Sequence, residues 1–358
     1  MHVLVCPTGF KGTLTAAAAA AAMDGGVRSA LPGATTRVLP LSDGGPGLLD
    51  AIGAVIGGER RSFRTTGPLG GPVGAETLWT APDEVVIEAA EACGLHLVPG
   101  PARDPAGADT RGVGTLLLAC ADRGARRAFV GLGGSASVDG GCGLARALGW
   151  RFLDAGGNDL PPGGAPLERL ARIVPASPPS LGVTALADVR SPLLGPDGAA
   201  RRFGPQKGAT PALVEALERG LARLADRVAR DAGRDPRDLP GAGAAGGLGY
   251  GLVAFAGAEL ADGSDWVLER TGFDGELDGA DLVVTGEGAW DPTSGLGKIT
   301  ARVLERARDA GVPALLACGR IEGAAPAEVH AADGGGARLD AGGLARLVEE
   351  ALRTAGAG

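Results

Sequence analysis

The chain is organised around a glycine-rich stretch, GLGGSASVDGGCG at residues 131–143. It follows the apolar run 128–130 and precedes a helical pattern at 144–148, so we expect a loop between a strand and a helix. Glycines in such a loop leave backbone N–H groups exposed, and Ser135 and Ser137 add hydroxyl donors. Asp139 puts a carboxylate at the end of the loop, where it could face a metal ion accompanying an anion. The stretch therefore predicts a phosphate site.

The same order of strand, glycine loop and helix recurs along the chain, which indicates α/β folding with mostly parallel sheets. Alternating patterns at 60–66 and 75–80, separated by Gly-Pro and Gly-Gly turns, predict an antiparallel hairpin. A chain of 358 residues exceeds what one core usually organises, so we expect two domains. We predict a discontinuous Rossmann-like α/β domain at 1–58 plus 275–358, and an inserted α/β domain at 59–274 that carries the hairpin.

Composition excludes several classes of partner. The net charge is -8, and lysine and arginine are scattered along the chain, which argues against nucleic acid or an anionic membrane surface. The five cysteines are widely spaced without a C-x-x-C pair, which disfavours a disulfide framework and a zinc site. No signal-peptide pattern and no apolar run of about 18 residues is seen. We expect a cytoplasmic protein that acts on small molecules, and we leave a homodimer open.

Two matches to a dinucleotide fingerprint need weighing. Gly131-x-Gly133-x-x-Ala136 fits the relaxed pattern, and Asp154 lies about where a ribose-binding acid should be. However, several predicted strands precede it, whereas a Rossmann fingerprint opens the first unit. The second match, at 241–246, does not follow an apolar strand. An NAD(P)-dependent dehydrogenase is therefore kept only as a third hypothesis.

The remaining chemistry rests on carboxylates and lysines. The chain has no G-x-x-x-x-G-K-[ST] and no G-x-S-x-G motif, and its three histidines are not next to a glycine-rich motif. Phosphoryl transfer suits this inventory, because it needs positioned donors, acids that hold Mg²⁺, and cations near the moving phosphate.

Ordered motifs over nearly the whole chain resemble the bacterial glycerate kinase family. They are FKGTL at 10–14, DGG at 43–45, GGSASVDGG at 133–141, Asp188-Val189 with PLLG at 192–195, FGPQKGAT at 203–210, GAGAAGG at 241–247, TGEG at 285–288 and Gly297-Lys298. The resemblance implies a two-domain α/β kinase that uses ATP and Mg²⁺, with glycerate as the acceptor.

Departures from the family pattern concentrate in the loops that resemble binding sites. Thr8-Gly9 stand where the family has Asp-Ser or Asp-Lys, and Pro46 replaces an acid. Arg190-Ser191 replace an Asp-Asn or Thr-Asn pair, and Ala289 replaces an arginine. Losing an arginine removes a charge-assisted carboxylate contact worth on the order of a few kcal/mol. We infer that phosphate and metal binding are kept, whereas the acceptor pocket has changed toward a related, larger hydroxy acid.

The predicted site residues fall into four groups. We expect catalytic roles for Asp188, Glu287, Lys298, Lys11 and Asp43. Phosphate or nucleotide binding is assigned to Gly133, Gly134, Ser135, Ser137 and Lys207. Acceptor binding is assigned to Arg190, Ser191, Trp290 and Asp291. The predicted metal ligands are Asp139, Asp188 and Glu287.

A second hypothesis is a catalytically impaired nucleotide-binding protein with a regulatory role, since acids are lost at Thr8 and Pro46. The identity of the acceptor, the hydroxyl that is phosphorylated and the oligomeric state are not determined by the sequence.

Overall fold

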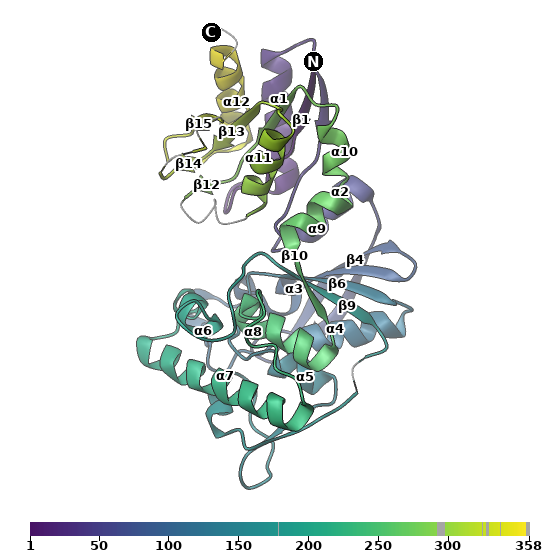
Figure 1. Cartoon of the computed structure of the whole chain (residues 1–358), viewed down its shortest axis with the longest axis vertical. Coiled ribbons are helices and arrows are strands. Elements are labelled where there is room, and N and C mark those ends of the chain that lie inside the picture. The colour runs from purple at the N-terminus through teal and green to yellow at the C-terminus, as the bar shows by residue number, and fades with distance from the viewer. Residues whose placement is uncertain (178, 292–297, 324, 327–328, 337, 356–358) are drawn as a thin grey trace. The chain divides into compact units, whose positions relative to one another are not determined.

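The computed structural model describes residues 1–177, 179–291, 298–323, 325–326, 329–336 and 338–355. The chain divides into two compact units. The first comprises Met1–Asp43, Gly47–Gly57 and Gly263–Gly358, and the second Gly44–Pro46 and Gly58–Asp262. Both units are α/β, with a parallel sheet in the first and a mixed sheet in the second, so the predicted fold class is confirmed (Figure 1). The predicted boundaries at residues 58 and 275 stay a prediction.

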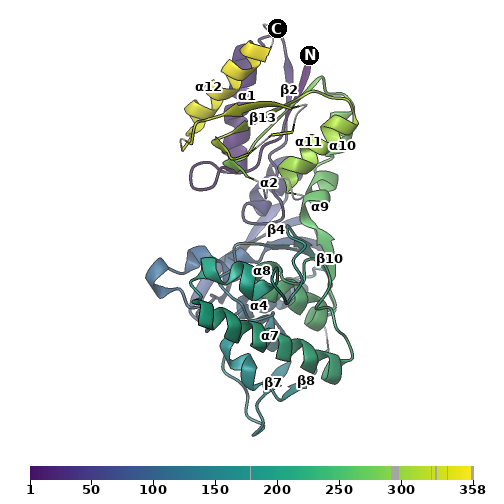
Figure 2. The same ribbon diagram turned by 60° about the vertical axis from the view of Figure 1, so that its left-hand side comes forward.

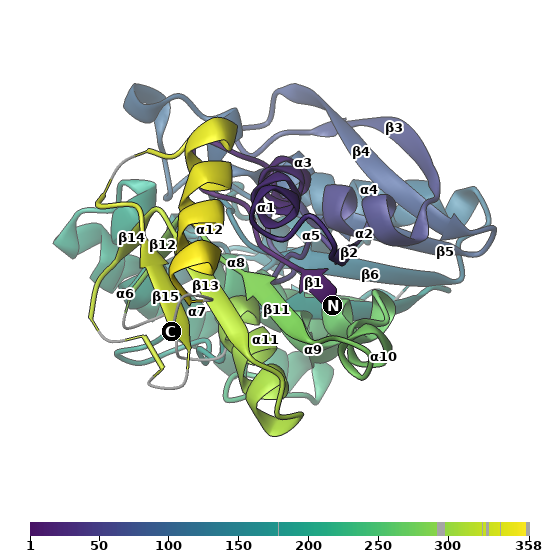
Figure 3. The same ribbon diagram turned by 90° about the horizontal axis from the view of Figure 1, so that it is seen from above.

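The first unit is a parallel sheet with the strand order β15-β13-β11-β1-β2. Helices α1 and α12 lie on one face of this sheet and α11 on the other (Figure 3). Apolar strands β1, β11 and β13 occupy the centre, as expected for a sheet covered on both faces. The elements are β1 (His2–Val5), α1 (Ala16–Ala30), β2 (Thr35–Val38), α2 (Leu48–Ile56), α9 (Gly263–Arg270), α10 (Phe273–Leu277), β11 (Leu282–Thr285), β12 (Ala289–Trp290), α11 (Ile299–Asp309), β13 (Ala314–Cys318), β14 (Arg320–Ile321), β15 (His330–Asp333) and α12 (Ala341–Ala355).

The alanine-rich helix α1 has a packing role. Thr15 caps it, because its Oγ1 accepts a hydrogen bond from Ala18 N at 3.2 Å. Small residues let α1 and α12 approach closely: a Cβ placed on Gly26 would lie 2.4 Å from the carbonyl oxygen of Ala345. The small side chains of this helix therefore allow it to pack closely against its neighbour.

The second unit is a mixed sheet with the order β10-β9-β6-β5-β4-β3. Strands β5, β6, β9 and β10 are parallel, whereas β3 and β4 form the predicted antiparallel hairpin. The elements are β3 (Glu59–Thr66), β4 (Pro72–Ala81), β5 (Glu84–Glu88), α3 (Ala90–Cys93), α4 (Arg111–Asp122), β6 (Arg127–Leu132), α5 (Cys142–Ala147), β7 (Arg151–Leu153), β8 (Arg172–Val174), β9 (Gly182–Ala187), α6 (Ala199–Phe203), α7 (Pro211–Ala232), α8 (Ala244–Gly251) and β10 (Glu259–Asp262), with short 3-10 turns at Leu95–Leu97, Gly100–Ala102, Ala165–Arg169 and Pro205–Lys207 and a π-helix at Leu252–Ala256.

The long helix α7 closes one side of this unit. Its apolar residues Leu217, Leu221, Leu224 and Val228 are fully buried, and Leu213 is partly buried. The small β7–β8 pair lies beside it (Figure 2). All five cysteines are buried and unpaired. Among the described residues, no helix is both long and apolar enough to cross a membrane.

Candidate active site

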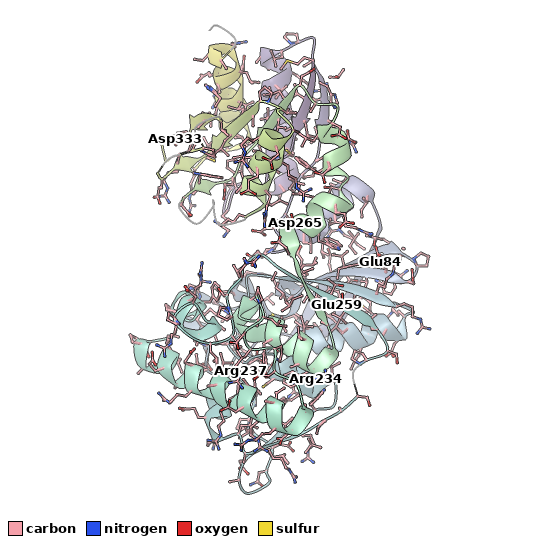
Figure 4. The ribbon with its side chains drawn as sticks, in the orientation of Figure 1. Glu84, Arg234, Arg237, Glu259, Asp265 and Asp333 are labelled. Carbon is pink, nitrogen blue, oxygen red and sulfur yellow. The ribbon has the colours of Figure 1, made fainter. Side chains whose placement is uncertain are left out.

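In the second unit, the carboxyl ends of the parallel strands β6 and β9 bring predicted site residues to one edge of the sheet. Leu132 of β6 is in register with Ala187 of β9, so the loops that begin at Gly133 and Asp188 start side by side. Open α/β sheets place their ligands at this edge. Glu84, labelled in Figure 4, begins the neighbouring strand β5 at the opposite edge.

One buried acid at this edge was not predicted. Glu88 ends β5 opposite Gly131 and is buried. Its sequence signal is the one used for Asp188, a carboxylate at the end of an apolar strand. The same reasoning applied to 84–88 would have found it.

Backbone hydrogen bonds hold the glycine loop from both sides. Leu95 N donates to Gly134 O at 2.7 Å, and Ala136 N donates to Cys93 O at 2.8 Å. Farther along the loop, Gly140 N donates to Gly246 O at 3.1 Å. The loop is therefore positioned in advance of any ligand.

Asp139 lies inside the loop and is fully buried. Its Oδ2 accepts hydrogen bonds from Thr110 N, Thr110 Oγ1 and Gly143 N at 2.9–3.0 Å, and its Oδ1 accepts one from Gly141 N. Burial raises the pKa of Asp139, and these hydrogen bonds oppose the shift. The contacts favour a positioning role, whereas the predicted metal-binding role of Asp139 stays a prediction.

Lys207 reaches the same loop from a 3-10 turn. Its Nζ donates to Ser135 Oγ at 2.8 Å and to Ser137 O at 2.6 Å, and the residue is only 3% exposed. Burial lowers the pKa of Lys207 to about 8, against smaller opposite effects of Cys93 and Asp139. The structure thus brings together Ser135, Ser137 and Lys207, three of the residues predicted to bind phosphate.

The second glycine-rich segment packs directly on this loop. Ala245, Gly246 and Gly247 have φ values of 51°, 71° and 87°. A Cβ placed on Gly246 would lie 1.9 Å from Ser137 O, and one on Gly247 would lie 2.8 Å from the Cα of Gly140. These glycines therefore permit backbone-to-backbone packing, which accounts for the fingerprint match at 241–246 without a dinucleotide.

The loop after β9 holds the acceptor residues predicted in this unit. Gly243 N donates to Ser191 O at 2.9 Å, and Ser191 is buried, whereas Arg190 is exposed. Leu193 N donates to Arg237 O at 2.9 Å. Arg237, labelled in Figure 4, is itself held by ion pairs with Asp226 and Asp235. Arg190 therefore lies in a loop that backbone hydrogen bonds to Gly243 and Arg237 hold in place.

Gly44–Pro46 belongs to the second unit and covers the glycine loop. A Cβ placed on Gly134 would lie 2.9 Å from Pro46 Cγ, and one placed on Gly133 would lie 2.9 Å from Gly45 Cα. Pro46, one of the departures from the family pattern, thus lies directly against the predicted phosphate loop.

In the first unit, the carboxyl ends of β1 and β11 bring two more predicted residues together. Thr8 N donates to Gly286 O at 3.0 Å, and a Cβ placed on Gly288 would lie 3.2 Å from Lys11 N. The backbone at Lys11 is therefore adjacent to the segment that carries Glu287. Asp43 follows at the same edge, since Leu41 N donates to Pro7 O at 2.9 Å.

Trp290 lies in a different setting from the other predicted acceptor residues. It is 5% exposed and lines a cavity of about 430 Å³ together with Ala301, Leu304 and Arg308 of α11. Asp291 and the α11 N-cap residue Lys298 flank residues 292–297, so Gly297 of the predicted Gly297-Lys298 motif lies outside the described residues. Acceptor binding by Trp290 stays a prediction.

The residues present fit Mg²⁺ only in part. Within the part of the chain that the structure describes, no three acidic, histidine or cysteine side chains form a ready-made metal cage. Mg²⁺ usually takes one or two protein carboxylates and completes its shell with phosphate and water. Partly exposed Asp188 and Glu287, each just after a strand, fit that pattern better than enclosed Asp139.

The chain is similar to known proteins along nearly its whole length. The model of the glycerate kinase family matches residues 3–355. The chain belongs to the glycerate kinase family. It is 40% identical over 324 residues to glycerate kinase of Halalkalibacterium halodurans, covering 89% of this chain and 85% of the relative. It is 38% identical over 328 residues to glycerate 2-kinase of Escherichia coli, covering 90% and 86%.

A crystal structure assigned to glycerate kinase 2 of Salmonella typhimurium LT2 aligns with a TM-score of 0.84 at 36% identity, covering 100% of this chain and 97% of that one. Glycerate kinases transfer a phosphoryl group to an alcohol, so the predicted class of enzyme, a phosphotransferase with an alcohol acceptor, is confirmed at the level of the family.

Proposed function

We propose that this member of the glycerate kinase family transfers the γ-phosphoryl group of ATP to a hydroxyl of glycerate or of a related, larger hydroxy acid. The observation that carries the proposal is the loop after β6, where Ser135, Ser137 and the buried ammonium of Lys207 converge in a backbone cradle. Such a cradle suits an anion with several oxygens, as a phosphate has.

The proposed roles follow from position and charge. Asp188, partly exposed beside the cradle, accepts the proton of the attacking hydroxyl or holds the metal. Lys11 and Lys298 supply positive charge to the moving phosphate, and Glu287 is the second candidate metal ligand. Bound Mg²⁺ would neutralise charge between the β- and γ-phosphates.

The altered loops support a changed acceptor. Pro46 places a ring against Gly134 at a position where the family pattern has an acid. This removes a negative charge near the cradle, and the arginine replaced by Ala289 removes a clamp for a carboxylate. Arg190 offers a cation from another loop. We therefore expect a preference for acceptors larger than glycerate.

The test measures ADP formation with MgATP over a panel of glycerate, larger hydroxy acids and polyols, with products identified by mass spectrometry. We expect turnover that is lost on adding EDTA and restored by Mg²⁺. Asp188→Asn should lower kcat by about 10²- to 10⁴-fold, the usual contribution of a general base. Asp159→Asn, which changes an exposed acid paired with Arg151, is the matched control and should leave kcat unchanged.

Two outcomes would contradict different parts of the proposal. Efficient turnover that prefers D-glycerate would contradict the altered acceptor pocket. Calorimetric binding of ATP without ADP formation on any acceptor would instead support a regulatory nucleotide-binding protein.

A further inference from the structure

Lysine is rare in this chain. Of its 34 lysine and arginine residues only three are lysines, Lys11, Lys207 and Lys298, and the other 31 are arginines. Positive charge is thus supplied by arginine nearly everywhere else. An ammonium is a compact group with three donors, whereas a guanidinium is a larger planar fork, so the two cannot exchange in a confined space. Among the three, Lys207 is the buried one.

The space around Lys207 is confined. A Cβ placed on Gly246 would lie 2.9 Å from Nζ and 1.9 Å from Ser137 O. The ammonium therefore fills a gap that exists only because residue 246 has no side chain. A guanidinium has no room there without movement of the loop or of the glycine-rich segment.

The charge of Lys207 is not neutralised by an ion pair. Its two hydrogen-bond acceptors, Ser135 Oγ and Ser137 O, are both neutral, and no carboxylate oxygen accepts a hydrogen bond from it in the described part of the chain. Lysine is almost never fully buried unless it is paired. Asp139 acts on Lys207 through its charge alone, because its carboxylate is hydrogen-bonded to Thr110, Gly141 and Gly143, so the ammonium can still stabilise a bound anion.

The hydrogen bonds also decide what the serines can do. Because Ser135 Oγ accepts from the ammonium, its own proton is available for donation to another acceptor. Ser137 Oγ is buried and has no hydrogen-bond partner in the structure. Both hydroxyls can therefore donate to the same anion, and a donor that is itself polarised by a cation is stronger.

We propose that Lys207 is a positioning residue. Its ammonium holds Ser135 and Ser137 through hydrogen bonds and polarises the Ser135 hydroxyl, which donates to the bound phosphate. Lys207 itself does not contact the phosphate. This inference rests on the proposed function. It differs from the direct phosphate contact predicted from the sequence, because the Nζ hydrogen bonds of Lys207 are made to Ser135 Oγ and Ser137 O of the loop itself.

A double-mutant cycle separates the two roles. Lys207→Met and Ser135→Ala should each lower kcat/KM by about 10- to 100-fold, the cost of a hydrogen bond to a charged group. If Lys207 acts through Ser135, the double variant should be no more than about threefold worse than the poorer single variant. Losses that multiply would show that Lys207 contacts the ligand independently and would overturn the proposal.

Two further variants sharpen this result. Lys207→Arg keeps the charge but not the shape, and we expect it to restore less than a tenth of the lost activity. Full rescue by arginine would contradict the confined geometry. Arg219→Met, which removes an exposed cation paired with Glu168 on the surface of α7, is the matched control and should leave kcat/KM unchanged. Thermal unfolding of each variant checks that it is folded.

A second readout does not depend on turnover. Because the chain has only three lysines, labelling lysine with ¹³C at Cε gives three signals, and the signal lost in Lys207→Met is that of Lys207. Its titration should have a midpoint near 8, and Ser135→Ala should lower the midpoint further by removing an acceptor for the charged form. A midpoint near 10.4, as for an exposed lysine, or no response to Ser135→Ala, would overturn the proposal even if no acceptor is found.

Discussion

Asp109 is a buried carboxyl group behind the glycine loop. Its Oδ1 accepts a hydrogen bond from Arg111 N at 3.0 Å. Burial, and next the charge of Asp139, raise the pKa of Asp109 to about 6, while Arg111 and Arg146 act in the opposite direction. Between about pH 4 and pH 6 the native state therefore binds more protons than the unfolded state, so stability falls as pH rises through this window.

Asp109→Asn should remove this penalty, because asparagine can still accept the hydrogen bond from Arg111 N. We expect the free energy of unfolding to rise by on the order of 1 to 3 kcal/mol at pH 7, with no gain at pH 4. Urea unfolding at pH 4, 5, 6 and 7 measures the change. Asp159→Asn changes an exposed carboxylate and is the control, so its free energy of unfolding should not rise in this way. An equal rise at pH 4 and pH 7 in Asp109→Asn would contradict the assignment of the effect to the raised pKa of Asp109.

Some residues of the site could be predicted from the sequence, whereas their contacts with distant residues could not. Ser135, Ser137 and Lys207 could be selected from the sequence, because glycine-rich loops expose backbone N–H groups and these side chains add further donors for an anion. The partner of Asp139 could not, since Thr110 lies 29 positions earlier and meets Asp139 only through tertiary packing. The same hydrogen bonds make Asp139 a candidate for positioning the loop, while its metal-binding role stays a prediction.

At the scale of elements, the segment 241–251 shows how one pattern can have two causes. Glycines spaced as in a dinucleotide fingerprint also allow two backbones to touch. Gly246 and Gly247 meet the loop 137–140, and Gly251 meets Gly141, whose Cβ position would lie 2.6 Å from the Gly251 Cα. Spacing alone cannot distinguish a bound ligand from a second chain segment, because both require the absence of a Cβ.

Two glycines with the same backbone angle allow the effect of close packing to be measured separately from the effect of the backbone conformation. Gly246 and Gly257 both have φ of 71°, but a Cβ on Gly257 would meet nothing within 4 Å. Gly257→Ala should cost about 1 kcal/mol for the left-handed conformation alone. Gly246→Ala should cost at least about 2 kcal/mol more, because its Cβ collides with Ser137 O.

Guanidinium chloride unfolding of the two alanine variants gives the comparison directly. Since Gly246→Ala also displaces the acceptor of Lys207, its kcat/KM should fall more than that of Gly257→Ala. Equal losses of stability in the two variants would mean that close packing at Gly246 contributes nothing.

At the scale of the molecule, the second unit contains everything that its core needs. Its large hydrophobic cluster extends from Phe63 to Ala258, and all six strands of its sheet lie between Glu59 and Asp262. The first unit is discontinuous in sequence, because β1 pairs not only with the nearby β2 but also with β11, more than 200 residues later. We therefore expect one continuous segment to fold alone in the second unit but not in the first.

A fragment of residues 58–262 should fold independently. We expect a cooperative urea transition and a near-ultraviolet circular dichroism spectrum typical of packed tryptophans. The fragment 1–57 is the control and should be unfolded, since it lacks β11, β13 and β15. If 58–262 is unfolded as well, the division into independent domains is wrong.

The sequence by itself determined the α/β class, the antiparallel hairpin and the family, because each of these depends on local periodicity or on ordered motifs. The tertiary structure alone decided that Lys207 donates hydrogen bonds to Ser135 and Ser137, that Asp139 is enclosed by Thr110, and that the glycines of 241–251 serve packing. The physical reason is burial: residue type and spacing indicate which groups can bind a phosphate, but only the packing of distant segments determines which of them water and a ligand can reach.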